Sequence, residues 1–258
     1  MSGEPRWHYV QARLQARHGE RLTEEDWHRL EAAHSFEHFL DRAQGTALAR
    51  FTAPLNATMT SHVVERLLRL AWRSYVAEIA SWLDRDWQPA VLWTAHIADL
   101  PAIAALLRGE TPAWAKDDAQ LTILADGEVP QRIAALEKSP LAPLAPESDR
   151  PPRLAERWSA HWQSLWPHSG TTEARALRGF TTLLETHAAQ LALAAPPDTS
   201  APHRLELAKS LTRLFRRHAA SPVAVFSHLA LVALDVERLR GNLIRRRLFG
   251  HNHVRVAA

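Results

Sequence analysis

The sequence predicts an all-α protein, and three observations support that class. Apolar residues along the longest segments recur at steps of three and four, which is the period of a helix. No run alternates apolar and polar residues between hairpin turns, as strands would. Only nine of the 258 residues are glycine, and 46% of the chain is apolar with 23% charged, which is typical of a globular protein with a sizeable core.

The amino-terminal residues predict two successive helices. Apolar residues take helical spacing within Trp7–Arg17. A second helix should begin after Thr23, whose hydroxyl can cap it with Asp26 as the reciprocal partner. Leu22 and Trp27 occupy the positions of a hydrophobic staple on either side of that cap.

The next segments predict a long helix over Ser61–Leu83 and a core helix over Pro89–Leu107. The apolar stripe of the first consists of Val64, Leu67, Leu68, Ala71, Tyr75, Ile79 and Trp82, with arginines and glutamates expected on the opposite face. The second is the most apolar stretch of the chain. Because His96, Asp99 and Pro101 interrupt it, we expect it to be buried in the core rather than to span a membrane.

Two proline-rich stretches, 138–152 and 194–202, are expected to be loops, because proline cannot continue a helix. They divide the chain into helical blocks 1–137, 153–193 and 203–258. In the middle block, three tryptophans at helical spacing are expected to pack in the core: Trp158, Trp162 and Trp166.

The last block predicts one long helix from Pro222 to Leu248. Ser221 can cap it, and proline is well placed at the first helical position. One packing seam contains Val225, Leu229, Val232, Val236, Leu239 and Leu243. Its far end concentrates five arginines: Arg238, Arg240, Arg245, Arg246 and Arg247.

Charge is distributed unevenly along the chain. Residues 204–258 hold 11 basic and 3 acidic side chains, a net +8, whereas the first 203 residues carry −5. This asymmetry suggests a charged partner for the carboxy-terminal end, which would be a protein, an anionic membrane surface or a nucleic acid. A solvated helix face is the alternative, and the five arginines are the candidate contact residues.

The sequence offers little catalytic chemistry. It contains no cysteine, which excludes disulfides, iron–sulfur clusters and a thiol nucleophile, and no phosphate-binding or dinucleotide-binding motif is present. His34, Glu37 and His38 fit the H-x-x-E-H zinc motif. Because Ser35 can start a new helix between the two histidines, we expect exposed histidines and no zinc peptidase. A weak metal site at His251 and His253 is the alternative, but we expect a frayed end at these two residues.

The carboxy-terminal helix is similar to the signature of the C/d subunits of V-type rotary ATPases. Asp235, Leu239 and Arg240 match that signature, whereas Arg238 stands where the family usually has asparagine.

Two further segments resemble the same family. Tyr9 and Arg13 match the opening of its first lobe. An echo of the Asp235 motif, running from Asp99 to Arg108, falls where the family has a related motif, although Ala102 replaces its asparagine. Residues 110–200 match poorly.

The resemblance implies a single helical domain over residues 1–258, a funnel-like array of repeated lobes with a shortened middle lobe. It implies a non-catalytic central-stalk subunit without a cofactor or metal of its own. Such a subunit couples the shaft to the membrane ring for proton or sodium transport, and lies on the cytoplasmic side with ring and shaft subunits as partners. The alternative is a helical nucleic-acid-binding protein that uses the carboxy-terminal arginines on phosphates.

Overall fold

A computed structural model describes residues 4–110, 113–146, 153–167, 171–193 and 200–249 of the chain. All of the regular elements in these residues are helical, and no strand occurs among them. The all-α class predicted from the sequence is therefore confirmed.

The amino-terminal part contains four helices: α1 (Glu4–Gly19), α2 (Glu24–Glu31), α3 (Phe36–Gln44) and α4 (Ala49–Thr52). Local capping sets two of their starts. Thr23 and Asp26 form the predicted capping box of α2. The Ser35 hydroxyl accepts a bond from the amide of His38 at 3.1 Å, which begins α3 at Phe36 as predicted.

The long predicted helix is α5 (Ser61–Ser81), and the apolar segment after it is divided into α6 (Gln88–Trp93), the 3₁₀ helix η1 (Thr94–Asp99) and α7 (Leu100–Leu107). By length and composition alone, Gln88–Leu107 is long and apolar enough to cross a membrane, and 56% of its most apolar window is buried inside the protein. Core helices pass the same test, so this observation is weak evidence for a span.

Short helices follow and lead into α10: η2 (Ala113–Asp117), α8 (Thr122–Ala125), α9 (Val129–Glu137), η3 (Ala142–Leu144) and α10 (Leu154–Ser164). Two tryptophans join α10 to α6. The indole of Trp93 donates to the carbonyl of Trp158 at 3.1 Å, and Trp158 donates to the carbonyl of Trp93 at 3.3 Å. Trp158 and Trp162 are buried and Trp166 packs beside them, which confirms their predicted core role.

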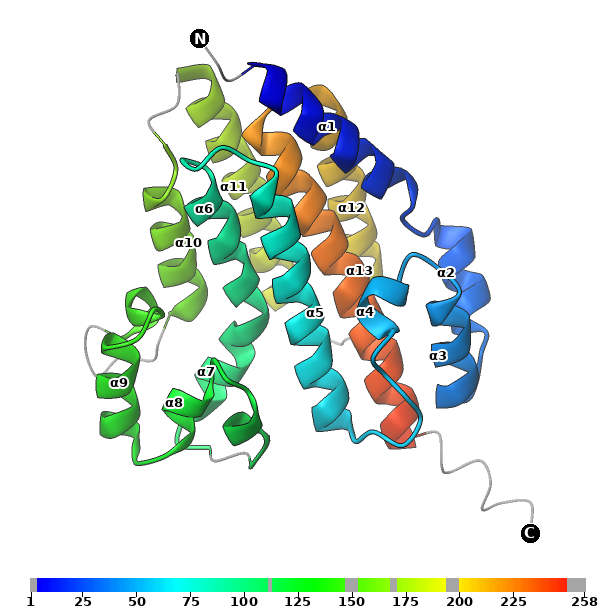
Figure 1. Cartoon of the computed structure of the whole chain (residues 1–258), viewed down its shortest axis with the longest axis vertical. Helices are drawn as coiled ribbons and strands as arrows, with labels where there is room; N and C mark the ends of the chain where they lie inside the picture. Colours follow the sequence, from blue (N-terminus) through cyan, green and yellow to red (C-terminus); the bar gives the residue numbers. More distant parts are fainter. Residues whose placement is uncertain (1–3, 111–112, 147–152, 168–170, 194–199, 250–258) are drawn as a thin grey trace.

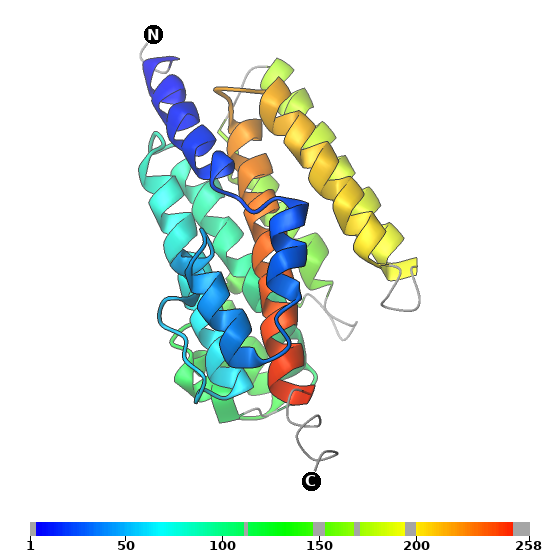
Figure 2. The same cartoon turned by 90° about the vertical axis from the view of Figure 1, so that its right-hand side faces the viewer.

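The chain ends with three long helices: α11 (Thr171–Leu193), α12 (Ser200–Arg217) and α13 (Pro222–Phe249). Figure 1 shows α13 running through the middle of the molecule, and Figure 2 shows α11 and α12 as a hairpin on one side of it. α13 packs against α1, α3, α5, α11 and α12. Its predicted seam is buried apart from the half-buried Val236. The predicted side-chain cap differs, because the Ser221 hydroxyl donates to the carbonyl of His218.

The buried residues form one continuous core from α1 to α13. The funnel of repeated lobes is not confirmed, and the echo between the two aspartate motifs does not extend to local structure. Asp99 ends a 3₁₀ helix, and the helix after it stops before Gly109, which has a φ of +90°. Asp235 lies inside α13, which continues past Gly241.

Candidate functional site

The first junction of charged residues joins the connection between α1 and α2 to α13. The Arg21 guanidinium donates to both carboxylate oxygens of Asp235, at 2.6 and 3.0 Å, and also to the carbonyl of Leu231 at 3.4 Å. Both charged side chains are largely buried, with 18% and 13% exposed. Burial raises the pKa of Asp235, and the nearby Arg21 charge opposes that rise.

One turn further along α13, Arg238 extends this junction to α2. Its guanidinium donates to both oxygens of Glu31, at 2.8 and 2.9 Å, and to Glu24 at 2.9 Å, while it lies over the ring of Trp27. Asn242 adds a bond to Glu31 at 2.9 Å. Burial would raise the pKa of Glu31, but these bonds to Arg238 and Asn242 hold it below its usual value. Arg238, which stands where the family that the sequence resembles usually has asparagine, is therefore bonded to acidic side chains within the chain.

Arg246 completes the junction from a buried position. It donates to the carbonyls of Ala33 and Glu31, both at 2.8 Å, and to the Asn242 side-chain oxygen at 2.7 Å. These two carbonyls lie at the end of α2 and just after it, where no further helical turn donates to them, and the buried guanidinium satisfies them. Arg246 also lies over the ring of Phe39.

The five carboxy-terminal arginines are thus not equivalent. Arg240 pairs with Glu65 at 2.6 Å and Glu237 at 3.2 Å, and Arg247 donates to the carbonyl of Ala57 at 2.9 Å. Arg245 is exposed, and its one bond to a described residue is a 3.5 Å contact with Asn242. The contact role or solvated face predicted from the sequence requires exposed side chains, yet Arg246 is buried and Arg247 is half-buried. A role of any of the five in partner binding stays a prediction.

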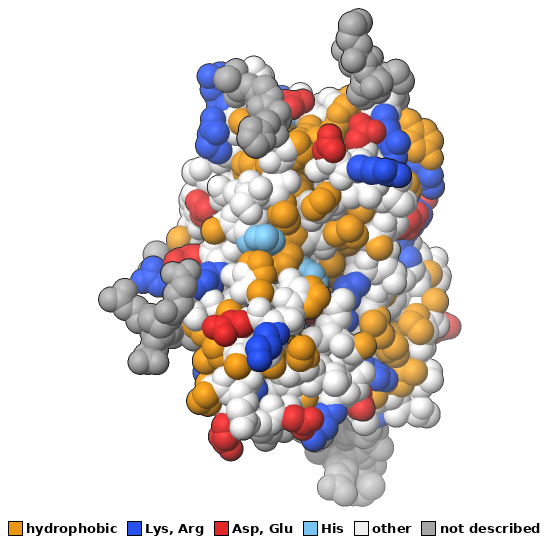
Figure 3. Space-filling view, turned by 60° about the vertical axis from the view of Figure 1, so that its left-hand side comes forward, with side chains coloured by type: hydrophobic (Ala, Val, Ile, Leu, Met, Phe, Trp, Pro, Cys, Tyr) orange, Lys and Arg blue, Asp and Glu red, His pale blue; other side chains and the backbone are white. Residues whose placement is uncertain are grey.

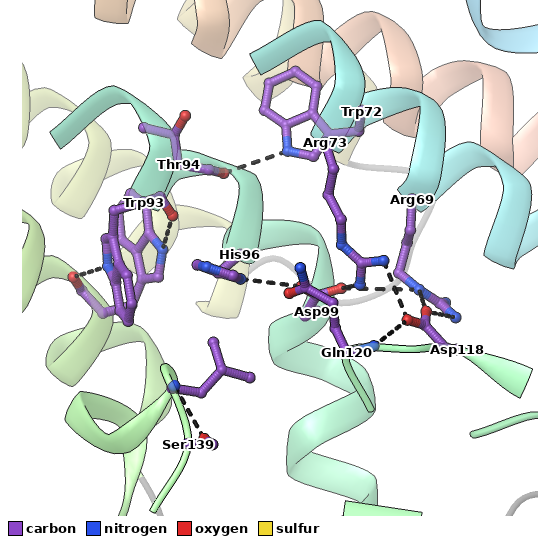
Figure 4. Close-up of polar contacts among 12 residues, drawn as sticks. Arg69, Trp72, Arg73, Trp93, Thr94, His96, Asp99, Asp118, Gln120 and Ser139 are labelled. Atoms are coloured by element: carbon purple, nitrogen blue, oxygen red, sulfur yellow. Dashed lines mark hydrogen bonds and ion pairs between the residues drawn. The ribbon is translucent and has the colours of Figure 1, made fainter. Parts of the chain in front are cut away.

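The second junction is a buried cluster of two arginines and two aspartates between α5, η1 and the loop before α8 (Figure 4). Arg69 donates from two nitrogens to Asp118 at 3.1 Å. Arg73 donates to Asp118 at 3.1 Å and to Asp99 at 2.5 Å. Neither carboxylate has any exposed side-chain surface. The structure thus places two positive and two negative charges inside the core.

Neighbouring groups complete this cluster. Burial would raise the pKa of Asp118, but the charge and hydrogen bonds of Arg73, the amide of Gln120 and the charge of Arg69 hold it below its usual value. His96 lies 3.4 Å from Asp99, between Nδ1 and a carboxylate oxygen. One donor, Nε of Arg73, is buried without a partner among the described residues.

The family-motif positions take different places in these junctions. Asp99 and Asp235 are each bound by an arginine of another element, and Leu239 is fully buried. Arg108 is exposed and pairs with Glu110 at 2.8 Å. Tyr9 and Arg13 lie together on the outer face of α1, with the guanidinium donating to the phenol oxygen at 2.6 Å.

The sequence reasoning missed Arg69, Arg73 and Asp118. Arginine was expected opposite the apolar stripe of α5, yet Arg69 is only 8% exposed. The spacing of Arg69 and Arg73, one helical turn apart beside buried positions, was the available signal.

A buried histidine forms a third polar site. The Tyr75 hydroxyl and Nε2 of His228 are 2.7 Å apart, and the His228 side chain has no exposed surface. Burial, assisted by the charges of Arg21 and other neighbours, lowers the pKa of His228 to about 3. The imidazole is therefore neutral at physiological pH.

The predicted histidine motif lies at the surface. His34 precedes α3, and Glu37 and His38 lie on its exposed side. In the part of the chain that the structure covers, no group of three or more His, Asp or Glu could hold a metal ion. The other histidine pair, His251 and His253, lies outside the described residues.

These sites can fix helices relative to one another, since their charged groups are bonded to groups of distant elements.

Comparison of the chain with models of protein families, with curated proteins and with solved structures finds no match.

Proposed function

We propose that this chain is a non-catalytic central-stalk subunit of a V-type rotary ATPase, folded as a funnel of helical lobes that transmits rotation of the shaft to the membrane ring. The observation that carries the proposal is the resemblance at Asp235, Leu239 and Arg240. In this reading the chain binds no nucleotide itself and lies against the cytoplasmic side of the ring.

The position of the motif residues supports this proposal. A part that transmits torque needs its helices to keep their relative positions under load. The two motif aspartates, Asp99 and Asp235, lie in buried ion pairs that join elements far apart in sequence. Leu239, four residues after Asp235, is fully buried.

The proposal is tested by assembly. The purified chain is mixed with the ring and shaft subunits encoded in the same genome, and native mass spectrometry reports complexes. We expect a stable complex with the shaft and ring subunits. A chain that is folded by circular dichroism yet joins neither would refute the proposal.

A test of coupling uses Arg245, because it is the exposed member of the last three arginines. In the assembled complex, Arg245→Glu is expected to leave ATP hydrolysis intact and to reduce ion transport. The matched control is Arg42→Glu on α3, which is also exposed and whose side chain bonds only to the carbonyl of Arg29. Equal transport in both variants would withdraw Arg245 from the interface.

Nucleic-acid binding is the second candidate, and one observation favours it. Three arginines on the exposed side of α12 have no acidic partner among the described residues: Arg213, Arg216 and Arg217. Against it, the predicted α13 arginines are largely engaged inside the chain, and the face in Figure 3 mixes acidic, basic and apolar side chains. A gel shift that weakens steeply with salt, and that is lost when the three arginines become glutamine, would favour this candidate over the ATPase.

A further inference from the structure

An open groove of about 780 Å³ lies between α1 and the end of α5. It is lined by Arg6, Tyr9, Arg13, Glu78, Ser81 and Trp82. In Figure 1, α1 lies at the upper end of the molecule. Four of the six lining residues are arginine, tyrosine or tryptophan, the residue types that dominate the binding energy of protein interfaces.

Arg13 is held in place by aromatic groups rather than by an acid. Its guanidinium carbon lies 4.3 Å from the centre of the Trp82 ring and 5.6 Å from that of Tyr9. It donates one hydrogen bond to the Tyr9 hydroxyl at 2.6 Å. Because a guanidinium has five N–H donors, several remain available to a ligand. The group is oriented in advance, which lowers the entropy lost on binding.

The other arginines of α1 already have carboxylate partners. Arg6 pairs with Asp84 at 3.3 Å, and Arg17 pairs with Glu78 at 2.6 Å. No acidic side chain in the described part of the chain bonds to Arg13. The Glu78 charge that lines the groove is thus balanced by Arg17, and the groove carries one positive charge without a counterpart.

We propose that this groove binds an acidic segment of a partner protein, with one Asp or Glu carboxylate on Arg13 and an adjacent apolar side chain on the exposed ring of Tyr9. Planar guanidinium groups match carboxylates in a two-bond geometry. Tyr9 is 52% exposed and supplies apolar surface beside the charge. Tyr9 and Arg13 are also positions of the family resemblance, but the inference rests on the groove itself, and its test is independent of an ATPase.

The charge of the groove favours a carboxylate over a phosphate. A phosphate group carries about −1.5 to −2 charges at neutral pH. Arg13 offers one balancing charge, and Arg6 and Arg17 are already paired with Asp84 and Glu78, so the excess negative charge of a phosphate would have no partner. A single carboxylate is balanced by Arg13 alone.

The test uses the full chain and two matched peptides, acetyl-Gly-Leu-Glu-Leu-Gly-amide and its counterpart with glutamine in place of glutamate. The Nε–H signal of Arg13, assigned through its loss in Arg13→Gln, is followed by nuclear magnetic resonance during titration. We expect the glutamate peptide to shift this signal saturably and the glutamine peptide to bind at least tenfold more weakly. Equal affinity of the two peptides, or no saturable shift at millimolar peptide, overturns the proposal.

Three variants assign the binding to Arg13, with peptide affinity measured by calorimetry. Arg13→Gln should abolish binding, and Arg13→Lys should weaken it several-fold, because lysine keeps the charge but loses the planar stacking. Arg213→Gln removes an exposed arginine that forms no ion pair and lies over no aromatic ring among the described residues, and should bind like the unaltered chain. Equal loss in Arg13→Gln and Arg213→Gln would show nonspecific charge attraction. Tighter binding of inorganic phosphate than of the glutamate peptide would replace the protein segment with a phosphate ligand.

Discussion

Replacing Asp118 with asparagine should strongly destabilise the protein, because it removes one of the two negative charges of the cluster with Arg69, Arg73 and Asp99. The carboxylate accepts three guanidinium bonds at 3.1 Å and has no exposed surface. In the variant, two buried guanidinium groups face one carboxylate. Breaking a buried ion pair from one side costs about 3–5 kcal/mol of unfolding free energy.

Urea unfolding followed by circular dichroism measures this cost. With a slope of about 2–3 kcal/mol per molar urea, the midpoint should fall by roughly 1–2.5 M. The control is Glu110→Gln, which breaks the exposed pair with Arg108 and should cost below about 1 kcal/mol. If Asp118→Asn lowers the free energy of unfolding no more than Glu110→Gln does, the buried cluster does not stabilise the fold.

The same substitution should change the response to acid. The folded state holds the pKa of Asp118 below its unfolded value, so this group contributes stability at pH values above the usual pKa range of a carboxyl group. That contribution is lost as pH falls through the folded pKa. Asp118→Asn should therefore lose less stability on acidification than the unaltered chain, and an identical acid response in both proteins would contradict the assignment.

Three further substitutions test other parts of the structure. His228→Gln should flatten the pH dependence of stability. The pKa of His228 is about 3 in the folded state, below its unfolded value, so protonation of the unfolded chain lowers the free energy of unfolding by up to about 1.4 kcal/mol per pH unit below about pH 6.5. Urea titrations at several pH values would show this difference. Leu239→Glu should cost at least about 3 kcal/mol and lower the melting temperature, since it places a carboxylate at a fully buried position; an unchanged melting curve would contradict this burial. Arg246→Glu should lower the free energy of unfolding by about 3 kcal/mol, whereas Arg245→Glu, at an exposed position, should change it by less than about 0.5 kcal/mol. Equal melting temperatures of the two variants would place both residues at the surface.

The starts of α2 and α3 could be predicted because capping is a local interaction. Thr23 bonds to Asp26 three residues on, and Ser35 bonds to the amide of His38 at the same spacing. Such pairs are visible in any short window of sequence. The seam of α13 was predictable for a similar reason, since its burial follows the period of one helix.

The partners of the arginines could not be predicted in this way. Arg238 meets Glu31 across a separation of 207 residues, and nothing in either local sequence indicates the other. The charge count of the carboxy-terminal block therefore suggested a free basic surface where the fold instead places bonded pairs. Arg69 was misplaced because the pattern treats any charge on a helix as exposed, whereas Asp118 compensates it inside the core.

The pairing of Arg21 with Asp235 also bears on how the chain is made. The two residues are 214 positions apart, so a ribosome that adds about 5–20 residues per second makes Asp235 roughly 10–40 s after Arg21. Throughout that interval α2 and the connection before it lack the helix that supplies the ionic partners of Glu31 and Arg21. The amino-terminal helices therefore complete their packing only when the last helix leaves the exit tunnel, and a product that stops before α13 lacks the element against which both ends of the chain assemble.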